Sequence, residues 1–544
     1  MKKTYIVLVL IGILAFFLRF YNATQIPPSL SWDEVSIGYN AYSILKTGRD
    51  EFGRFMPLDA FVAYGDYKPV LPIYLTVPFV ALFGLTELAV RLPSVIAGTL
   101  TVFLTYFLVL ELFWKLEIRN LKLQAVALLS ALLLAVSPWH MQLSRAGFEA
   151  NIALFFVVLG IWCVLKARER PTLFIAAWLP FVASIYTFNS ARYFVPMLGL
   201  LLLIYCWKEI RMHTKQFIAG LSIAVIFLLP IVPYLVSPQA RLRFAEVNIF
   251  TDLSVVQTAN QRIDADGNTW WSKVFHNRRI GYAKSYLLHL FDHLEPSFLF
   301  IRGDGNPKFS IQDVGQLYIV ELPFLIMGIY WLFARDRRTA WFLVAWLISA
   351  IIPAATARET PHALRIENSL PVWQIFIAYG IVSSIGHQVS KKIKYVFVVV
   401  ILFMYVGNFS YYWHNYYNHY AVEYSGEWQY GYREAIQAIA PIKNQYDTII
   451  MTENIGRPHM YIAFYEGLDP QEYRRTMDGS FDAAGFYNPY GLGKYRFVRQ
   501  GIGKMEPTTL YVLEPQYVPD SARVITTVHL LNGKTVLVLF DRGI

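Results

Sequence analysis

The sequence predicts a polytopic α-helical membrane protein with about eleven transmembrane helices, a folded first outer loop and a C-terminal α/β domain outside the membrane. Two features of the composition predict this class. Of the 544 residues, 56% are hydrophobic and only 16% are charged, whereas soluble chains carry about 25% charged residues. Apolar runs of roughly 17 residues or more, long enough to cross a bilayer, recur over most of residues 1–412.

We therefore expect a transmembrane domain over residues 1–412 and a soluble domain over residues 413–544. The predicted spans are 4–20, 85–113, 123–139, 149–166, 171–187, 192–207, 216–236, 316–334, 339–356, 369–387 and 393–412. The first run lacks a small-residue cleavage site, so it is expected to be an uncleaved helix rather than a signal peptide. The short, proline-containing stretch 70–84 is assigned to an interfacial or re-entrant helix within the first outer loop, residues 21–84.

The distribution of basic residues predicts the orientation of these spans, because cytoplasmic loops collect Lys and Arg. Loops of one parity hold seventeen basic residues, and the three short loops of the other parity hold four. The seventeen are Lys2, Lys3, Lys115, Arg119, Lys122, Lys166, Arg168, Arg170, Lys208, Arg211, Lys215, Arg335, Arg337, Arg338, Lys391, Lys392 and Lys394. The N-terminus is thus expected in the cytoplasm of a plasma-membrane protein and the C-terminal domain outside. The formal charge of +10 then reflects topology rather than binding to nucleic acid.

Two further outer regions are large. Residues 237–315 connect the seventh and eighth spans and are polar and aromatic. In the C-terminal domain, helical patterns over Tyr432–Ala440 and His459–Glu466 accompany β-rich runs, which predicts a small α/β fold. The β-rich runs are Asp447–Thr452, Tyr495–Val498, Thr509–Leu513, Ala522–Leu530 and Thr535–Phe540.

Asp33 and Glu34 form a pair of carboxylates just after the first apolar run. Local sequence favours a helix cap, with Ser31 as N-cap and two acids in the first turn. A carboxylate at the membrane surface is also a candidate general base, a role worth about 10²–10⁴-fold in rate. The two interpretations are compatible, because a capped helix can also present a carboxylate.

Cations of the outer side form the second candidate group. Lys68 precedes the short helix of the first outer loop, and the four arginines of the basic-poor loops are Arg145, Arg192, Arg358 and Arg365. Each alone is typical of an interfacial anchor. Together with nearby carboxylates they favour an anionic lipid substrate, because Arg pairs bidentately with phosphate oxygens and a fixed cation stabilises a leaving phosphate.

Two more residues belong to this set. Glu149 lies at the outer end of the fourth span, and His362 lies in the outer loop that also holds Arg358 and Arg365.

In the order of these motifs the chain resembles the GT-C class of polyprenyl-phosphate-sugar-dependent glycosyltransferases, and most of all the group of protein O-mannosyltransferases and aminoarabinose transferases. The resemblance rests on the N-terminal span, Asp33-Glu34, Tyr67-Lys68-Pro69, the segment 87–93 (ELAVRLP) and Ser144-Arg145. It covers residues 1–412 and fits the soluble tail more loosely.

The resemblance implies a GT-C-like fold and an integral-membrane glycosyltransferase, a hexosyl- or pentosyltransferase, that moves a monosaccharide from a polyprenyl-phosphate donor to an acceptor hydroxyl outside the cytoplasm. Asp33 would be the general base of one inverting displacement, with Glu34 and Glu149 as acidic partners. The residues expected to bind the lipid phosphate or the sugar are Lys68, Arg145, Arg192, His362 and Arg365.

No bound cofactor is expected, and a divalent metal is possible but not expected, since only the oligosaccharyltransferase branch of this class requires one. The expected partners are the polyprenyl-phosphate sugar, membrane lipids and an acceptor that is a glycan, a lipid or a protein. A polytopic transporter or lipid flippase without transferase activity is the alternative. Such folds place ionisable residues near the bilayer midplane, whereas here these residues gather at the outer ends of the spans.

Overall fold

The computed structural model describes residues 2–114, 120–240, 248–386, 390–483 and 485–543. Lys115, Arg119, residues 241–247 of the second outer region and the last residue of the span predicted over 369–387 lie outside these ranges. Residue contacts divide the chain into two units. Unit 1 comprises residues 1–19, 96–144 and 149–413, and unit 2 comprises residues 20–95, 145–148 and 414–544.

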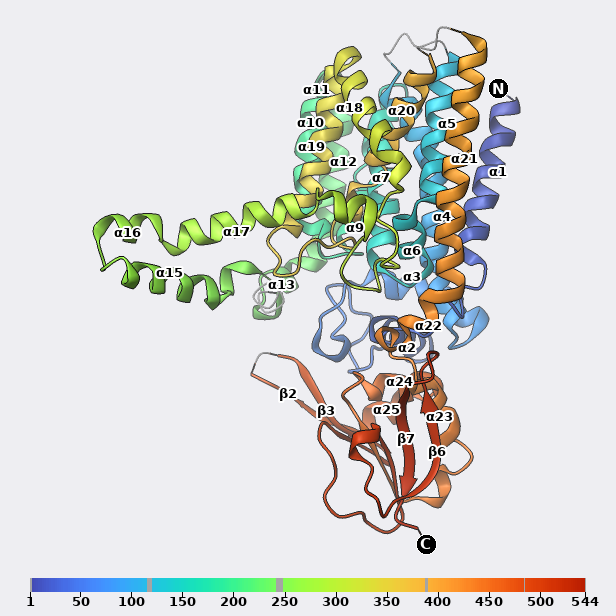
Figure 1. Ribbon diagram of the computed structural model, residues 1–544, viewed down its shortest axis with the longest axis vertical. Helices are drawn as coiled ribbons and strands as arrows, with labels where there is room; N and C mark the ends of the chain where they lie inside the picture. Colours follow the sequence, from blue (N-terminus) through green and yellow to red (C-terminus); the bar gives the residue numbers. More distant parts are fainter. Residues whose placement is uncertain (1, 115–119, 241–247, 387–389, 484, 544) are drawn as a thin grey trace. The chain divides into compact units, whose positions relative to one another are not determined.

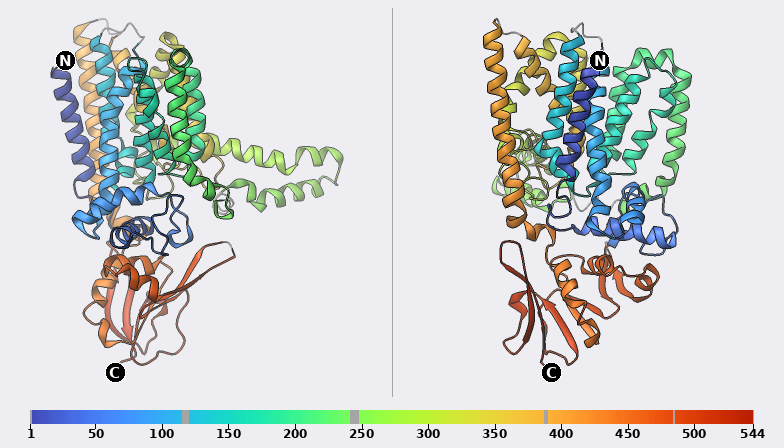
Figure 2. Two further views of the ribbon diagram at one scale, coloured as in Figure 1. Left: turned by 180° about the vertical axis from the view of Figure 1, so that it is seen from behind. Right: turned by 90° about the vertical axis from the view of Figure 1, so that its right-hand side faces the viewer.

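Unit 1 is a helical bundle whose long helices run side by side (Figures 1 and 2). Its helices include the C-terminal part of α4 and nearly all of α21. The bounds are α1 (Lys2–Phe20), α4 (Glu87–Leu112), α5 (Asn120–Val136), α6 (Pro138–Arg145), α7 (Glu149–Lys166), α8 (Leu173–Ala176), α9 (Leu179–Ile185), α10 (Ala191–Tyr205), α11 (Trp207–Met212), α12 (Thr214–Leu228), α13 (Val232–Leu235), α15 (Leu253–Ala265), α16 (Trp270–Phe275), α17 (Arg278–Asp292), α18 (Leu322–Arg335), α19 (Arg337–Ala354), α20 (Val372–Gly386) and α21 (Lys391–Asn415).

A helix lies at each of the eleven predicted span positions. By length and composition, six helices among the described residues could cross a membrane, or seven if the pair α5 and α6, bent by 55°, counts as one span. Helix α10 has 15 residues and is about 22 Å long, short of the roughly 30 Å of a hydrocarbon core. The predicted span 171–187 is broken into α8 and α9. The polytopic helical fold is confirmed, and the number eleven stays a prediction.

Small residues set the closest helix contact of the bundle. A Cβ added at Gly328 of α18 would lie 1.8 Å from the carbonyl oxygen of Phe376, and one at Gly380 of α20 would lie 2.0 Å from that of Phe324. The two backbones thus touch directly, as is common between helices in membranes, where packing rather than hydrophobic transfer drives association.

Unit 2 joins the first outer loop to the C-terminal domain. Its helices are α2 (Trp32–Thr47), α3 (Leu71–Phe83), α22 (Ala421–Glu423), α23 (Tyr432–Ile439), α24 (Pro458–Tyr465) and α25 (Pro470–Thr476), together with the first turns of α4. Helix α3, the short apolar stretch, has 13 residues. Its length of about 20 Å does not cross a bilayer, in accord with the interfacial assignment. The predicted boundary between the transmembrane domain and the soluble domain, at residue 412, stays a prediction.

The C-terminal part contains one seven-stranded mixed sheet with the order β2-β3-β4-β1-β5-β7-β6. The central strand β1 is parallel to β4 and β5, and the remaining pairs are antiparallel. The strands are β1 (Thr448–Thr452), β2 (Met477–Phe481), β3 (Tyr487–Leu492), β4 (Tyr495–Val498), β5 (Thr509–Leu513), β6 (Arg523–His529) and β7 (Thr535–Asp541). Five of these strands were predicted. The sequences of β2 and β3 contain Gly, Pro and Asp, which have low β propensity, so their pattern does not indicate strands.

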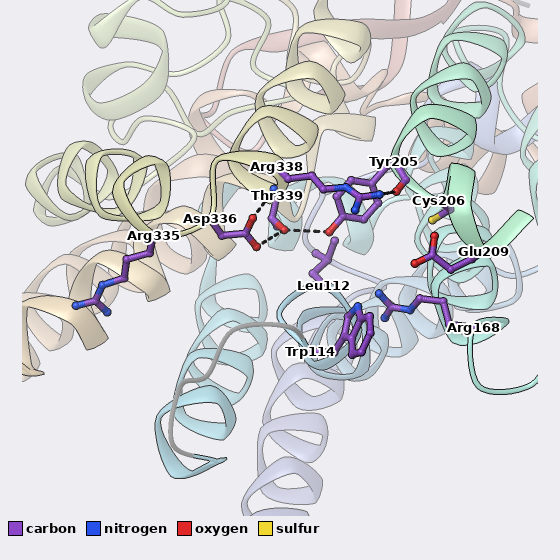
Figure 3. Close-up of a pocket in the computed structure, with 10 residues that line it drawn as sticks. All are labelled: Leu112, Trp114, Arg168, Tyr205, Cys206, Glu209, Arg335, Asp336, Arg338 and Thr339. Atoms are coloured by element: carbon purple, nitrogen blue, oxygen red, sulfur yellow. Dashed lines mark hydrogen bonds between the residues drawn. The ribbon is translucent and has the colours of Figure 1, made fainter.

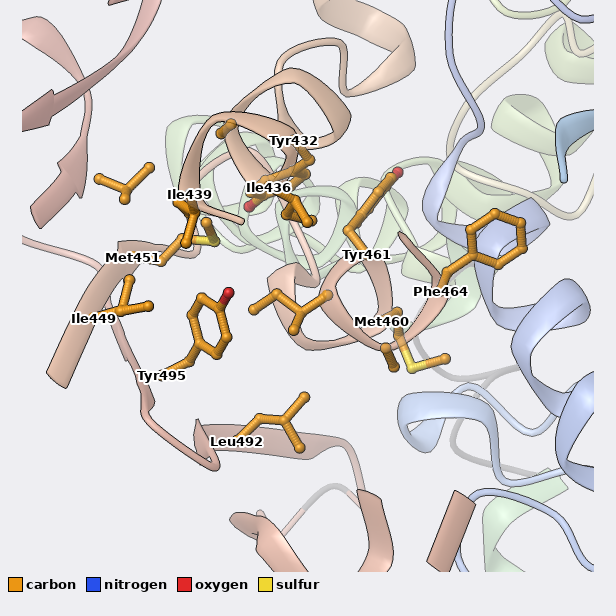
Figure 4. Close-up of a cluster of buried hydrophobic side chains, with 14 of the residues drawn as sticks. Tyr432, Ile436, Ile439, Ile449, Met451, Met460, Tyr461, Phe464, Leu492 and Tyr495 are labelled. Carbon is orange, nitrogen blue, oxygen red and sulfur yellow. The ribbon is translucent and has the colours of Figure 1, made fainter. Parts of the chain in front are cut away.

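Alternation along the strands builds two apolar layers. Ile449 and Met451 of β1 face α23 and α24 (Figure 4), whereas Tyr511 and Leu513 of β5 belong to the layer on the other face. The first layer also takes in side chains of the first outer loop and α4, namely Leu30, Val35, Tyr39, Tyr64 and Val90. The first outer loop and the C-terminal domain therefore share one hydrophobic core, which positions the carboxylates discussed next.

Candidate functional site

Ser31 is the N-cap of α2 and closes a complete capping box. Its hydroxyl accepts from the backbone N–H of Glu34 at 3.4 Å, and its own N–H donates to Glu34 Oε2 at 2.9 Å. The predicted cap is confirmed, and it assigns Glu34 a local structural contact. Asp33, one residue earlier, lies outside this exchange.

Glu34 is fully buried in an ion pair with Arg91 of α4. Arg91 Nε lies 2.8 Å from Glu34 Oε1, and both side chains are essentially inaccessible. The backbone N–H of Gly147 donates to the same oxygen at 2.9 Å. An added Cβ at Gly147 would lie 3.2 Å from the Glu34 side chain, so a small residue is needed at this contact. Glu34 is thus bound on both oxygens by protein groups.

Two buried arginines hold the segment that leads into α2. Arg91 donates to the carbonyl oxygens of Ala23, Pro27 and Ser29 at 2.5–2.8 Å. Arg145 donates to those of Tyr21 and Ile26 at 2.7 and 3.0 Å, and to the Tyr416 hydroxyl at 3.0 Å. Five carbonyls between residues 21 and 29 are therefore satisfied by two guanidinium groups. In this structure Arg145 is wholly buried and serves the backbone; its predicted contact with a phosphate stays a prediction.

Asp33 lies in a polar cluster with Lys68, Tyr64 and Asp66. Its Oδ1 accepts from the Tyr64 hydroxyl and lies 2.7 Å from Lys68 Nζ, which also lies 2.9 Å from Asp66 Oδ2. The Asp33 side chain is 34% exposed, whereas that of Lys68 is 9% exposed. The structure thus brings together the predicted base and the predicted phosphate-binding lysine, and it leaves the carboxylate accessible.

The backbone that carries Tyr64 and Lys68 is strained. Ala63, Tyr64 and Tyr67 all have φ between 41° and 52°, a left-handed conformation that costs non-glycine residues of order 1 kcal/mol or more each. A two-stranded bridge between Phe61 and Lys68, with N–H···O distances of 2.9 and 2.8 Å, closes this loop. The Tyr64 N–H donates to Glu51 Oε1 at 2.9 Å. Strain held in this way is common at functional sites.

Glu51 is expected to make this loop pH-sensitive. Burial raises the pKa of its carboxyl from 4.5 to about 8. Since the folded pKa lies above the unfolded value, the contribution to stability is complete below about pH 4.5 and is lost as the pH rises through about 8, a change of order a few kcal/mol. Glu51→Gln keeps the acceptor for Tyr64 and removes the ionisation. We expect its melting temperature to decline less than that of the wild type as the pH rises from about 4.5 to about 8.

The matched control for this prediction is Glu423→Gln, which removes an exposed carboxylate of α22. This variant should keep the wild-type pH profile of thermal unfolding. A Glu51→Gln profile that also superimposes on the wild type would assign the loss of stability between about pH 4.5 and pH 8 to another group.

The C-terminal domain contributes Arg457 to the cluster. Its guanidinium lies 4.7 Å from the centre of the Tyr64 ring, and its Nη1 donates to the Tyr487 carbonyl at 3.3 Å. The preceding Gly456 has φ +108° and a Cβ there would lie 2.7 Å from the Trp32 ring, so only glycine allows this close approach. Tyr461 of α24 donates to the Leu30 carbonyl at 2.9 Å. The soluble domain thus supports the N-terminus of α2.

The remaining predicted residues lie in unit 1. Arg192 of α10 stacks 5.1 Å over the Tyr234 ring, and its Nε and Nη2 are buried without a hydrogen-bond partner among the described residues. Ser190 donates to the Arg365 carbonyl at 3.2 Å, so the structure brings the loops of Arg192 and Arg365 together. Arg365 Nη1 donates to the Glu359 carbonyl.

His362 and Glu149 are less accessible. His362 is 8% exposed, lies 3.8 Å from Asp304 Oδ2 and packs against Phe309. Burial lowers the pKa of His362 well below its usual range and raises that of Asp304 to about 6. Glu149 is the first residue of α7 and is buried. The roles predicted for both residues stay predictions.

Within the described ranges, no group of three or more His, Cys, Asp or Glu side chains lies close enough to hold a metal ion. A cavity of about 220 Å³ in unit 1 is lined by residues of the loops predicted to be cytoplasmic, including Arg168, Arg335 and Arg338 (Figure 3). It lies at the Tyr205 end of α10, about 20 Å along the helix from Arg192. Arg168 pairs with Glu111 at 3.1 Å, and Arg338 donates to the Tyr205 carbonyl. This cavity contains none of the predicted site residues.

Sequence reasoning did not single out Arg91, Tyr64, Asp66 or Arg457 as site residues. Arg91 lies in the segment 87–93, which contributed to the family resemblance without a role for this arginine, and Tyr64 lies outside the motifs of that resemblance. The one available signal was Asp66, two residues before Lys68, because an acid next to a buried lysine is expected to pair with it.

The N-terminal part of the chain is similar in sequence to a known family. The family model for dolichyl-phosphate-mannose-protein mannosyltransferase matches residues 9–237, which include the segment with Asp33, Lys68, Arg91 and Arg145. The comparison with curated protein sequences gives no match.

The solved structures of ArnT have a similar fold. ArnT from Cupriavidus metallidurans in the apo state superimposes with a TM-score of 0.51 at 14% identity, over 100% of this chain and 98% of that chain. The same protein bound to undecaprenyl phosphate has a TM-score of 0.51 at 14% identity, over 98% of this chain and 97% of that chain. The oligosaccharyltransferase AglB from Archaeoglobus fulgidus has a TM-score of 0.49 at 12% identity, over 86% of this chain and 64% of that chain. The predicted resemblance is confirmed: in its N-terminal sequence and in its fold, the chain is similar to the GT-C glycosyltransferases that use polyprenyl-phosphate sugars.

Proposed function

We propose that the protein is an integral-membrane glycosyltransferase that moves a monosaccharide from a polyprenyl-phosphate donor to an acceptor hydroxyl on the outer side of the plasma membrane. One observation carries this proposal: an accessible carboxylate, Asp33, is held against a lysine ammonium and a tyrosine hydroxyl by a deeply buried scaffold. The donor class is proposed by similarity to a dolichyl-phosphate-mannose-protein mannosyltransferase family and to ArnT, which binds undecaprenyl phosphate.

Asp33 is the proposed general base. Its carboxylate takes the proton of the acceptor hydroxyl as the oxygen attacks the anomeric carbon, and the bond from that carbon to the phosphate oxygen breaks in the same step. A single displacement inverts the anomeric configuration. The tyrosine and lysine partners fix the orientation of the carboxylate before the acceptor arrives, which reduces the reorganisation needed in the transition state.

Lys68 is the proposed partner of the leaving phosphate. Its ammonium is shared by Asp33 and Asp66, which keeps the cation in place. Phosphate oxygens carry developing negative charge as the sugar leaves, so a preplaced cation stabilises the transition state more than the ground state.

The second acid, Glu34, is proposed as a positioning residue rather than a group that contacts substrate. Its carboxylate is bound by the protein groups of Arg91, Ser31 and Gly147. Arg145 is proposed to act in the same way through the segment 21–26. For unit 1 we propose separately that Arg192 binds an anion, because two buried guanidinium nitrogens have no partner within the described ranges. Arg365, whose loop contacts that of Arg192, is the proposed second cation there.

A transporter or flippase would need ionisable groups at mid-depth in the bundle. The family match is to transferases, so this alternative is not favoured. The acceptor, whether protein, lipid or glycan, is the part of the proposal left to experiment.

Lys68→Met tests the proposal, since methionine keeps an unbranched side chain of nearly the same length and removes the charge. We expect kcat/KM for a polyprenyl-phosphate sugar to fall by about 10²-fold, as when one transition-state donor is removed. Lys68→Arg keeps a cation and should recover part of this loss. The measurement is sugar transfer by the purified protein at several donor concentrations, with thermal unfolding as a check of folding. Folded Lys68→Met with unchanged dependence on donor concentration would remove the phosphate role.

A further inference from the structure

A helical hairpin in unit 1, residues 253–292, leaves its largest apolar side chains exposed within the described part of the chain. It consists of α15, α16 and α17 and extends away from the bundle, crosswise to the long helices (Figures 1 and 2). Its helices begin at N-caps that accept backbone N–H groups: Asp252, Thr269 and Asn277. The hairpin is thus regular structure rather than an irregular loop.

The exposed apolar side chains of the hairpin are large. Trp270 is 79% exposed, Leu253 68%, Phe275 67% and Phe291 61%. No residue of α17 is buried, and its exposed Ile280, Leu287 and Phe291 recur with the spacing i, i+7, i+11, which is one face of a helix. An apolar stripe of this kind on a water-exposed element needs something to cover it.

The charges of the hairpin indicate what covers it. The hairpin carries five cations, Arg262, Lys273, Arg278, Arg279 and Lys284, against three carboxylates, Asp264, Asp266 and Asp292, which makes a formal charge of +2. Tryptophan and cationic side chains beside an apolar stripe are typical of helices in the headgroup layer of a bilayer.

The base of the hairpin sets its direction. His289 lies 2.8 Å from the Ala357 carbonyl, and the Tyr282 hydroxyl donates to the Asp252 carbonyl at 3.0 Å. These contacts hold α17 to the end of α19 and tie α15 to α17. Because the bundle helices cross the membrane, an element crosswise to them runs along the membrane plane. It leaves the bundle in the half away from the N-terminus (Figure 1), which the charge distribution predicts to be the outer half.

We propose that the α15–α17 hairpin lies in the interfacial layer of the membrane and binds anionic phospholipid headgroups through Lys273, Arg278 and Arg279. The apolar stripe inserts at the level of the upper acyl chains, and the cations lie among the phosphates, where each contributes to binding on an anionic surface. This proposal does not depend on the transferase reaction.

The test places a fluorophore on each face of the hairpin in the full-length protein. Cys163 and Cys206 are first replaced by alanine. An environment-sensitive probe is then attached at Phe275→Cys on the apolar tip or, as the matched control, at Gln261→Cys, which is exposed on α15. The proteins are reconstituted in vesicles of phosphatidylcholine, with or without phosphatidylglycerol, containing lipids brominated near the headgroup. Bromolipid and aqueous iodide are the two quenchers.

We expect bromolipid to quench the probe at position 275 at least about twofold more than the probe at position 261, and iodide to do the reverse. Charge reversal at Lys273, Arg278 and Arg279 should reduce bromolipid quenching at position 275 in vesicles with phosphatidylglycerol. Equal iodide quenching at the two positions would overturn the proposal. A second outcome would also overturn it: the probe at position 275 is protected from both quenchers, and energy transfer occurs between differently labelled copies. A second copy of the protein, rather than lipid, would then cover the stripe.

Discussion

Asp33→Asn is expected to lower the rate of sugar transfer by about 10²–10⁴-fold while the protein stays folded, which is the range for loss of a general base. The amide has the size of the carboxylate and still accepts from the Tyr64 hydroxyl, but it cannot take a proton. Its ion pair with Lys68 is also lost; at a carboxylate that is 34% exposed, such a pair contributes little to stability. The expected signature is loss of kcat with a nearly unchanged melting temperature.

Asp66→Asn is the matched control, because Asp66 contacts the same ammonium at 2.9 Å. This variant removes the same charge two residues from Lys68 and leaves Asp33 in place, so its rate should fall much less. Single-turnover transfer with saturating donor separates the chemical step from binding. Near-normal turnover by Asp33→Asn, or equal losses in both variants, would end the assignment of Asp33 as the base.

Much of the fold could be predicted from the sequence, because the signals are local. Apolar length predicts a helix at every proposed span position, and alternation predicts β1 and β4 to β7. The pattern around Ser31 predicts the cap of α2. Strands β2 and β3 depend on pairing with neighbours rather than on their own propensity, so tertiary context overrides the local signal.

The site was predictable only in part, because its scaffold is built from contacts distant in sequence. Asp33 and Lys68 were found from their charge and position. The partners of Glu34 are 57 and 113 residues away, and no pattern within one motif indicates them. Arg145 was assigned to the phosphate because it stands on the side poor in basic residues. The structure shows its guanidinium on backbone carbonyls, a need that arises only when the segment 21–29 is buried, and its contact with a phosphate stays a prediction.

Arg91→Met is expected to destabilise unit 2 more than any other single substitution considered. Methionine fills similar volume, but Glu34 then stays buried without its counter-ion, and breaking a buried pair from one side costs about 3–5 kcal/mol. The carbonyls of Ala23, Pro27 and Ser29 lose their donor as well. We expect a clear drop in melting temperature. Transferase activity should fall even at low temperature, because the segment before α2 no longer fixes Asp33.

The double variant Glu34→Gln, Arg91→Met distinguishes a charge effect from a loss of packing. It removes the uncompensated carboxylate, so we expect it to recover part of the stability that Arg91→Met loses, since replacing both members of a buried pair is often tolerated. Activity should recover less, because the carbonyls of residues 23–29 still have no guanidinium donor. A double variant no more stable than Arg91→Met would assign the loss to packing and backbone hydrogen bonds. An Arg91→Met protein with the wild-type melting temperature would show that this pair does not hold the site.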